Sequence, residues 1–69
     1  MEDKTIKVRG MFGQHCERAI IDAFNKIGNI EKISVSLKYG TIAFSHNPQL
    51  APLEIIINAI IDEGYDVIG

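Results

Sequence analysis

Hydrophobic and polar residues alternate near the start of the chain and then change to a helical spacing. Ile6 and Val8 are flanked by polar residues over 5–9, and this period of two is typical of a strand with one buried face. Over 16–27 the hydrophobic residues recur every three or four positions, which predicts an amphipathic helix. Gly28 follows this helix as a left-handed stop.

The same order of elements returns in the second part of the chain. Alternating hydrophobic residues over 32–38 and 41–45, joined by a two-residue turn, predict a β-hairpin. Pro52 suits the first position of a second helix, whose isoleucine-rich stripe ends at Gly64. A short last strand is expected over 65–68.

A strand-helix-strand unit therefore occurs twice along the chain. Right-handed crossovers place both helices on one face of a four-stranded antiparallel sheet. The expected fold class is α+β, a ferredoxin-like βαββαβ arrangement. Because 69 residues leave room for little more than one domain, we expect a single domain over 1–69.

Charge is unevenly divided between the two parts of the chain. Residues 1–40 hold all seven basic residues and five acids, whereas 41–69 hold four acids and no base. A net charge of −2 lacks the basic footprint of a nucleic-acid binder, so no nucleic-acid partner is expected. The basic first segment, with Lys7, Arg9 and Arg18, is expected to steer docking onto an acidic partner.

No hydrophobic run approaches the ~20 residues that a membrane span requires. The first residues are charged and lack the apolar core of a signal peptide. We therefore expect a soluble cytoplasmic protein, or a soluble module of something larger, without direct membrane insertion.

A single cysteine, Cys16, stands where the loop over 10–15 meets the predicted first helix. One thiol excludes an intrachain disulfide framework and a four-thiolate zinc site within one chain. The helix dipole favours a thiolate in the first turn, which makes such a cysteine a better metal ligand or nucleophile. His15 offers a second donor beside it, and Gly10 and Gly13 permit unusual loop conformations. A small buried hydrophobic residue is the alternative interpretation of Cys16.

Catalytic arrangements find little support in these residues. A thioredoxin-like redox site needs a second cysteine, and a nucleophilic triad needs a base and a third orienting group. The other histidine, His46, is expected on the surface at the far end of the hairpin, away from the loop. We therefore expect no enzyme activity.

The loop resembles the Gly-Met-x-Cys-x-x-Cys loop of heavy-metal-associated domains, the family of bacterial copper chaperones and of the N-terminal domains of copper-transporting ATPases. Gly10–Met11 match the opening of the motif, Gln14–Cys16 match its end, and Gly64–Asp66 match the closing turn of the family. The resemblance covers essentially the whole chain. It implies a ferredoxin-like domain that hands copper(I) by ligand exchange to a copper-transporting ATPase or a related domain. It also implies that Met11 packs beneath the loop and that Tyr65 shields the metal.

The chain departs from the family motif at one ligand position. Gly13 stands where the family has its first metal-binding cysteine, so the chain lacks the two thiolates that hold a soft monovalent ion almost linearly. In one interpretation, Cys16 still binds copper(I), or zinc or mercury(II), with help from His15 or from Cys16 of a second chain in a metal-bridged homodimer. In another, the domain is a metal-free interaction or regulatory module. In a third, Gly13 is an engineered loss of a ligand.

Overall fold

The helices and strands follow the predicted order of two strand-helix-strand units. The computed structural model describes the backbone of residues 1–10 and 14–68, and the side chains of residues 1–10 and 17–68. In chain order the elements are β1 (Glu2–Arg9), α1 (Gln14–Ile27), β2 (Ile30–Ser36), β3 (Thr41–His46), α2 (Leu53–Asp62) and β4 (Asp66–Val67).

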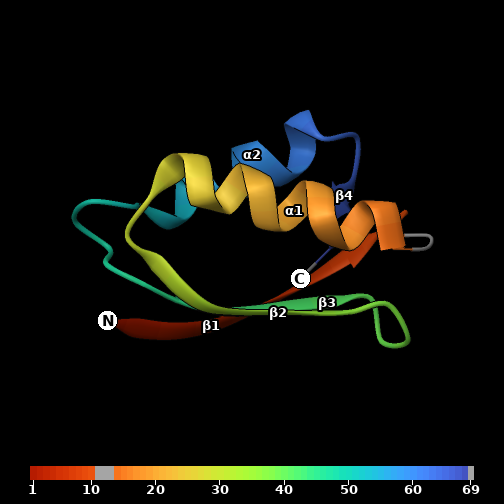
Figure 1. Cartoon of the computed structure of the whole chain (residues 1–69), viewed down its shortest axis with the longest axis horizontal. Helices are drawn as coiled ribbons and strands as arrows, with labels where there is room; N and C mark the ends of the chain where they lie inside the picture. The colour runs from red at the N-terminus through yellow and green to blue at the C-terminus, as the bar shows by residue number, and fades with distance from the viewer. Residues whose placement is uncertain (11–13, 69) are drawn as a thin grey trace.

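The strands form a four-stranded antiparallel sheet in the order β2-β3-β1-β4. Both helices lie on the same face of this sheet (Figure 1). α1 contacts β2 and α2 contacts β4, so each helix covers one side of the sheet, and the two helices pack against each other. The predicted ferredoxin-like βαββαβ fold is confirmed.

The hydrophobic core lies between the sheet and the helices. Side chains alternate across a strand, so Ile6 and Val8 of β1 and Ile42 and Phe44 of β3 all face the helices. Phe24 of α1 packs edge to face against Phe44, with ring centroids 5.2 Å apart. The buried hydrophobic residues are Ile6, Val8, Ile20, Phe24, Ile42, Phe44, Ala51, Ile56 and Ile60.

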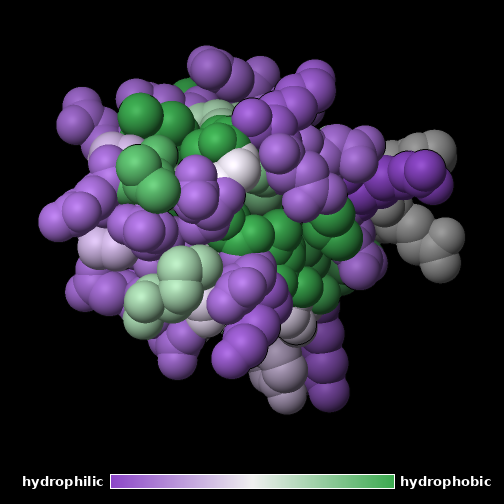
Figure 2. Space-filling view, turned by 60° about the vertical axis from the view of Figure 1, so that its left-hand side comes forward, coloured by the Kyte–Doolittle hydropathy of each residue, from purple (hydrophilic) through white to green (hydrophobic). Residues whose placement is uncertain are grey.

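The surface is hydrophilic over most of the face drawn in Figure 2, with hydrophobic residues gathered in smaller patches. Large hydrophobic side chains are exposed at both ends of the sheet. Met1, Leu50 and Ile55 lie toward the N-terminal end of β1, whereas Tyr39 and Ile61 lie toward its C-terminal end. The exposed hydrophobic surface is therefore divided among several places.

β2 begins at Ile30, before the predicted strand, and contains a β-bulge. The pairing of β2 with β3 shifts register between Glu31 and Ser34. Lys32 adopts a left-handed φ of 55° within this bulge. Ile30 and Ile33 are three positions apart, so in a regular strand they would point to opposite faces of the sheet. The extra residue of the bulge brings both side chains to the face that packs against the core.

Candidate functional site

The site is expected where β1 ends and the chain crosses to α1. β1 ends at Arg9, and Gly10 follows it with a φ of 96°. The predicted loop residues Met11 and Gly13 lie outside the described residues. The backbone of Gly10 therefore marks the described start of the loop.

His15 and Cys16 lie in the first turn of α1. The helix begins at Gln14 rather than at Cys16, so the prediction that His15 belongs to the loop is wrong. Glu17 places a negative charge in this first turn, where it interacts favourably with the helix dipole. The side chains of His15 and Cys16 lie outside the described residues, so their roles as ligands stay predictions.

Tyr65 is held beside the start of the loop by the turn that ends α2. The amide of Gly64 donates to the carbonyl of Ile61 over 2.9 Å, and the amide of Tyr65 donates to the carbonyl of Ile60 over 3.4 Å. This pair of bonds is a Schellman motif, and Gly64 supplies its left-handed residue with a φ of 95°. The half-buried Tyr65 ring reaches Gly10, where an added Cβ atom would stand 3.8 Å from Cδ1 of the ring. Tyr65 therefore borders the loop, and its shielding of a metal stays a prediction.

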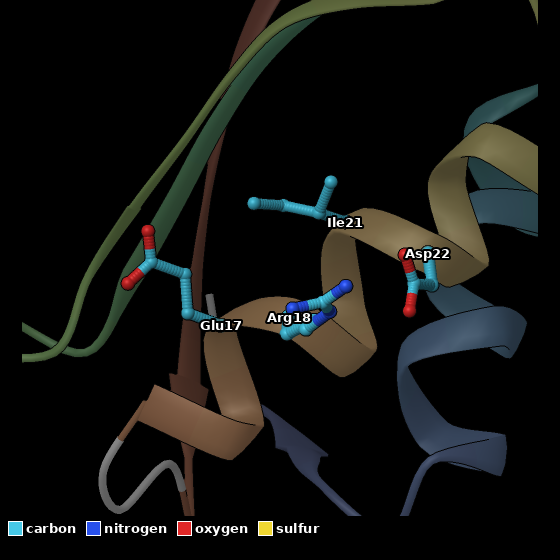
Figure 3. Close-up of a pocket in the computed structure, with 4 residues that line it drawn as sticks. All are labelled: Glu17, Arg18, Ile21 and Asp22. Atoms are coloured by element: carbon cyan, nitrogen blue, oxygen red, sulfur yellow. The ribbon is translucent and has the colours of Figure 1, made fainter.

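An open cavity of about 370 Å³ lies along the part of α1 that follows the loop. Its described lining comes from successive turns of the helix, with Glu17, Arg18, Ile21 and Asp22 drawn in Figure 3. In this view Glu17 and Ile21 project to the side on which the strands run. Of these four residues, the sequence identified only Arg18 as a candidate for partner binding. A spacing of four residues links Glu17 to Ile21 and Arg18 to Asp22, which places each pair on one side of a helix. This mixture of charges and one apolar group is suited to contact with another protein surface.

The structure divides the predicted basic surface between two layers. Lys7 and Arg9 alternate with the buried Ile6 and Val8, so they lie on the face of the sheet that carries no helix. Arg18 is exposed on α1, in the opposite layer. An acidic partner that contacts one flat face of the molecule therefore meets only part of this charge.

His46 lies away from the loop, as expected, but the prediction that it is a surface residue is wrong. His46 is 1% exposed and pairs with Glu2 at the opposite end of β1 from Arg9. Its Nδ1 donates to the carbonyl oxygen of Ala51 over 2.8 Å, whereas its Nε2 is buried without a hydrogen-bond partner. The ring also contacts Phe44 edge to face, with centroids 5.6 Å apart. His46 is a core residue.

Among the residues whose side chains the structure describes, no three His, Cys, Asp or Glu side chains lie close enough together to hold a metal ion. No helix in the described residues combines the length and apolar character needed to cross a membrane.

Residues 5–66 match the sequence model of the heavy-metal-associated domain. The match begins within β1 and ends within β4, so it spans the described helices and strands. The copper chaperone CopZ of Bacillus subtilis is 34% identical to this chain over 67 residues, which cover 97% of each protein.

Solved structures share the same fold. A structure described as the CopZ metallochaperone superposes with a TM-score of 0.91 at 28% identity, covering 97% of this chain and all of that chain. A copper binding domain from HMA7, a P-type ATPase, superposes with a TM-score of 0.86 at 24% identity, covering all of this chain and 96% of that chain. At this lower identity, the second likeness concerns the fold alone.

Proposed function

The chain belongs to the heavy-metal-associated domain family, and from that premise we propose that it binds copper(I) through Cys16 and passes it to a related domain. The observation that carries the proposal is the family match, which extends across the loop that holds the only cysteine of the chain. Members of this family are carriers of metal rather than enzymes, and this chain is not an enzyme. Metal is therefore the cargo of the domain.

The chemistry of the proposed site rests on one thiolate. Thiolate sulfur is a soft ligand that selects copper(I), and the dipole of α1 stabilises the charged form of Cys16 in the first helical turn. We assign His15 as an auxiliary donor and Met11 as packing beneath the loop. Tyr65 would cover the metal from the side of β4, in keeping with its contact with Gly10. Gly13 supplies no ligand, so one coordination position stays open to an incoming thiolate.

Transfer would proceed by ligand exchange through this open position. A thiolate of the receiving domain adds to copper(I) while the bond to Cys16 still holds, and the Cys16 bond then breaks. The receiving partner we propose is a copper-transporting ATPase or another heavy-metal-associated domain. The exposed Lys7 and Arg9 would attract an acidic surface of that partner. We also propose that residues 1–69 are a single domain that works in the cytoplasm.

The test of this function is a copper(I) competition titration against a chromophoric chelator under reducing conditions. Cys16→Ser is expected to abolish binding, because it removes the only thiolate. Gly13→Cys is expected to raise the affinity by several orders of magnitude, because it restores the second thiolate. A Cys16→Ser variant with unchanged affinity would remove Cys16 from the mechanism.

The replacement of a ligand position by Gly13 favours a second candidate, a metal-free interaction or regulatory module. Equilibrium dialysis against copper(I), zinc and mercury(II) under reducing conditions separates the two functions. Uptake of copper(I) at one ion per chain, or one per two chains, supports the carrier. Uptake of none of the three metals supports the metal-free module.

A further inference from the structure

The two edges of the sheet differ in how their backbone is arranged. The strand order β2-β3-β1-β4 makes β2 and β4 the edge strands. β2 carries the bulge at Lys32, which interrupts the row of backbone groups along its outer side. β4 has two residues, whereas β1 has eight, and their pairing covers Val8 and Arg9 (Figure 1). On the β4 side, residues Glu2–Ile6 of β1 are therefore the edge of the described sheet, and we call them the open edge.

The hydrogen bonds of β1 show which backbone groups the open edge presents. Along an antiparallel strand, successive residues direct their amide and carbonyl groups to opposite sides. The amide of Ile68 donates to the carbonyl of Lys7 over 2.8 Å on the β4 side, so Asp3 and Thr5 direct their groups to the same side. No described residue pairs with either of them there. Two amides and two carbonyls are therefore available to an added antiparallel strand.

The side chains of the open edge disfavour a second copy of this chain as the added strand. Its first four residues are exposed, so no described element covers them. The antiparallel register that would place Asp3 opposite Lys7 is blocked, because Ile68 already occupies the position beside Lys7. The two remaining registers that match the hydrogen-bonding groups place Lys4 opposite Lys4 or Asp3 opposite Asp3. Like charges directly opposite each other are destabilising, so the open edge suits a strand of different sequence.

The residues of the open edge define the side chains that such a strand would carry. Ile6 faces the helices and is 4% exposed, so an apolar residue opposite it would extend the core. An acidic residue is favoured opposite Lys4, and basic residues are favoured opposite Asp3 and Glu2. The carboxylate of Asp3 is already held in place, because the hydroxyl of Ser45 donates to its Oδ1. The open edge therefore combines a backbone pattern with a pattern of charge.

We propose that the open edge binds an extended segment of another protein, which runs antiparallel to β1 and continues the line of β4. Read from its N-terminus, the segment has an apolar, a polar, an acidic and two basic residues. The backbone groups of Asp3 and Thr5 bind its main chain, and the charges over 2–4 select its side chains. This surface uses no residue of the proposed copper(I) site. The proposal therefore goes beyond the proposed function, and it stands or falls independently of copper(I) binding.

NMR titration of the full chain with a synthetic peptide tests the proposal. The peptide is valine-threonine-glutamate-lysine-lysine, blocked at both ends, and it is expected to shift the amide signals of Asp3 and Thr5. The control peptide, valine-threonine-lysine-glutamate-glutamate, reverses all three charges. It is expected to bind at least about tenfold more weakly, because three favourable cross-strand pairs become repulsive. Equal affinity for the two peptides, shifts centred on other strands, or no binding at millimolar peptide would each overturn the proposal.

Two variants at Thr5 test whether the outward backbone groups bind the peptide. Thr5→Pro removes one outward amide and no bond to β3, and proline is tolerated at a sheet edge in this orientation. It is expected to weaken peptide binding by at least about tenfold. Thr5→Val keeps the amide and a branched Cβ, and it is expected to leave the affinity unchanged. Equal binding by the two variants would contradict the proposal.

Hydrogen exchange of the unbound chain tests the open edge without any substitution. The amide of Thr5 points outward, whereas that of Ile6 points toward β3. The amide of Thr5 is therefore expected to exchange at least about tenfold faster than that of Ile6, and to slow when the peptide binds. Exchange at Thr5 as slow as at Ile6 in the unbound chain would mean that the edge is already paired, and the proposal would be wrong.

Discussion

The two ends of the β-sheet differ in how deeply the side chains of their turns are buried. At the end away from the loop, the amide of Ala51 donates to the carbonyl of Asn47 over 2.7 Å, and buried His46 donates back to the carbonyl of Ala51. At the loop end, Tyr39 is largely exposed, and the half-buried Tyr65 lies beside Gly10. The difference indicates that the buried groups at the far end contribute more to the stability of the fold than the exposed turn at Tyr39 does.

The largest expected effect on stability comes from the far end. His46→Ala removes a fully buried ring and leaves the carbonyl of Ala51 without its donor. We expect the free energy of unfolding to fall by about 3–5 kcal/mol, from the cavity and the lost hydrogen bond together. Urea denaturation followed by circular dichroism measures the loss.

Two further variants separate the causes of that loss. In His46→Asn the side-chain amide can still donate to Ala51, so about half of the destabilisation is expected, from packing alone. Tyr39→Ala, at the loop end, is expected to change stability by less than about 0.5 kcal/mol because the side chain is exposed. If Tyr39→Ala cost as much as His46→Ala, the contrast between the two ends would be wrong.

The burial of His46 shows what the sequence pattern could have predicted about the fold. Ile42, Phe44 and His46 share the same phase of an alternating strand, and all three face the core. The predicted alternation over 41–45 ends one residue before β3 does, and His46, at the far end of the hairpin, is expected on the surface. The periodicity of hydrophobic residues therefore predicted the helices and strands and the residues that face the core. The end of a strand, however, depends on its pairing with neighbouring strands. At the end of β3, His46 pairs with Glu2 of β1 on one side and with Ile30 of β2 on the other.

The candidate site was less predictable than the fold, because it joins distant parts of the chain. Gly10 and Tyr65 are far apart in sequence and meet only because β4 pairs with the end of β1. Spacing along the chain does not reveal this contact. The motif resemblance supplied Tyr65.

A substitution with a smaller expected effect on stability tests whether backbone packing at the loop end also supports the fold. At Gly40, with a φ of 64°, an added Cβ would stand only 2.9 Å from the carbonyl oxygen of Val8. Gly40→Ala is therefore expected to cost about 2–3 kcal/mol, the sum of left-handed strain and a backbone clash.

Gly28→Ala is the matched control for this clash. Its φ of 78° is also left-handed, but an added Cβ meets no atom within 4 Å, so only the conformational cost of about 1 kcal/mol is expected. Urea denaturation of both variants gives the difference. Equal losses would mean that the turn moves away from Val8 at no cost.

The smallest expected effect is a gain in stability at the β-bulge, between the two ends. Lys32 is an exposed residue with a left-handed φ of 55°, which costs a side-chain-bearing residue about 1 kcal/mol or more. Lys32→Gly removes this cost but adds freedom to the unfolded chain, so a net gain of up to about 0.5 kcal/mol is expected. Lys32→Val, with a branched Cβ, is expected to lose about 1–2 kcal/mol at the same position. If Lys32→Val were the more stable variant in urea denaturation, the bulge would not depend on the left-handed residue, and the phase of Ile30 and Ile33 would need another cause.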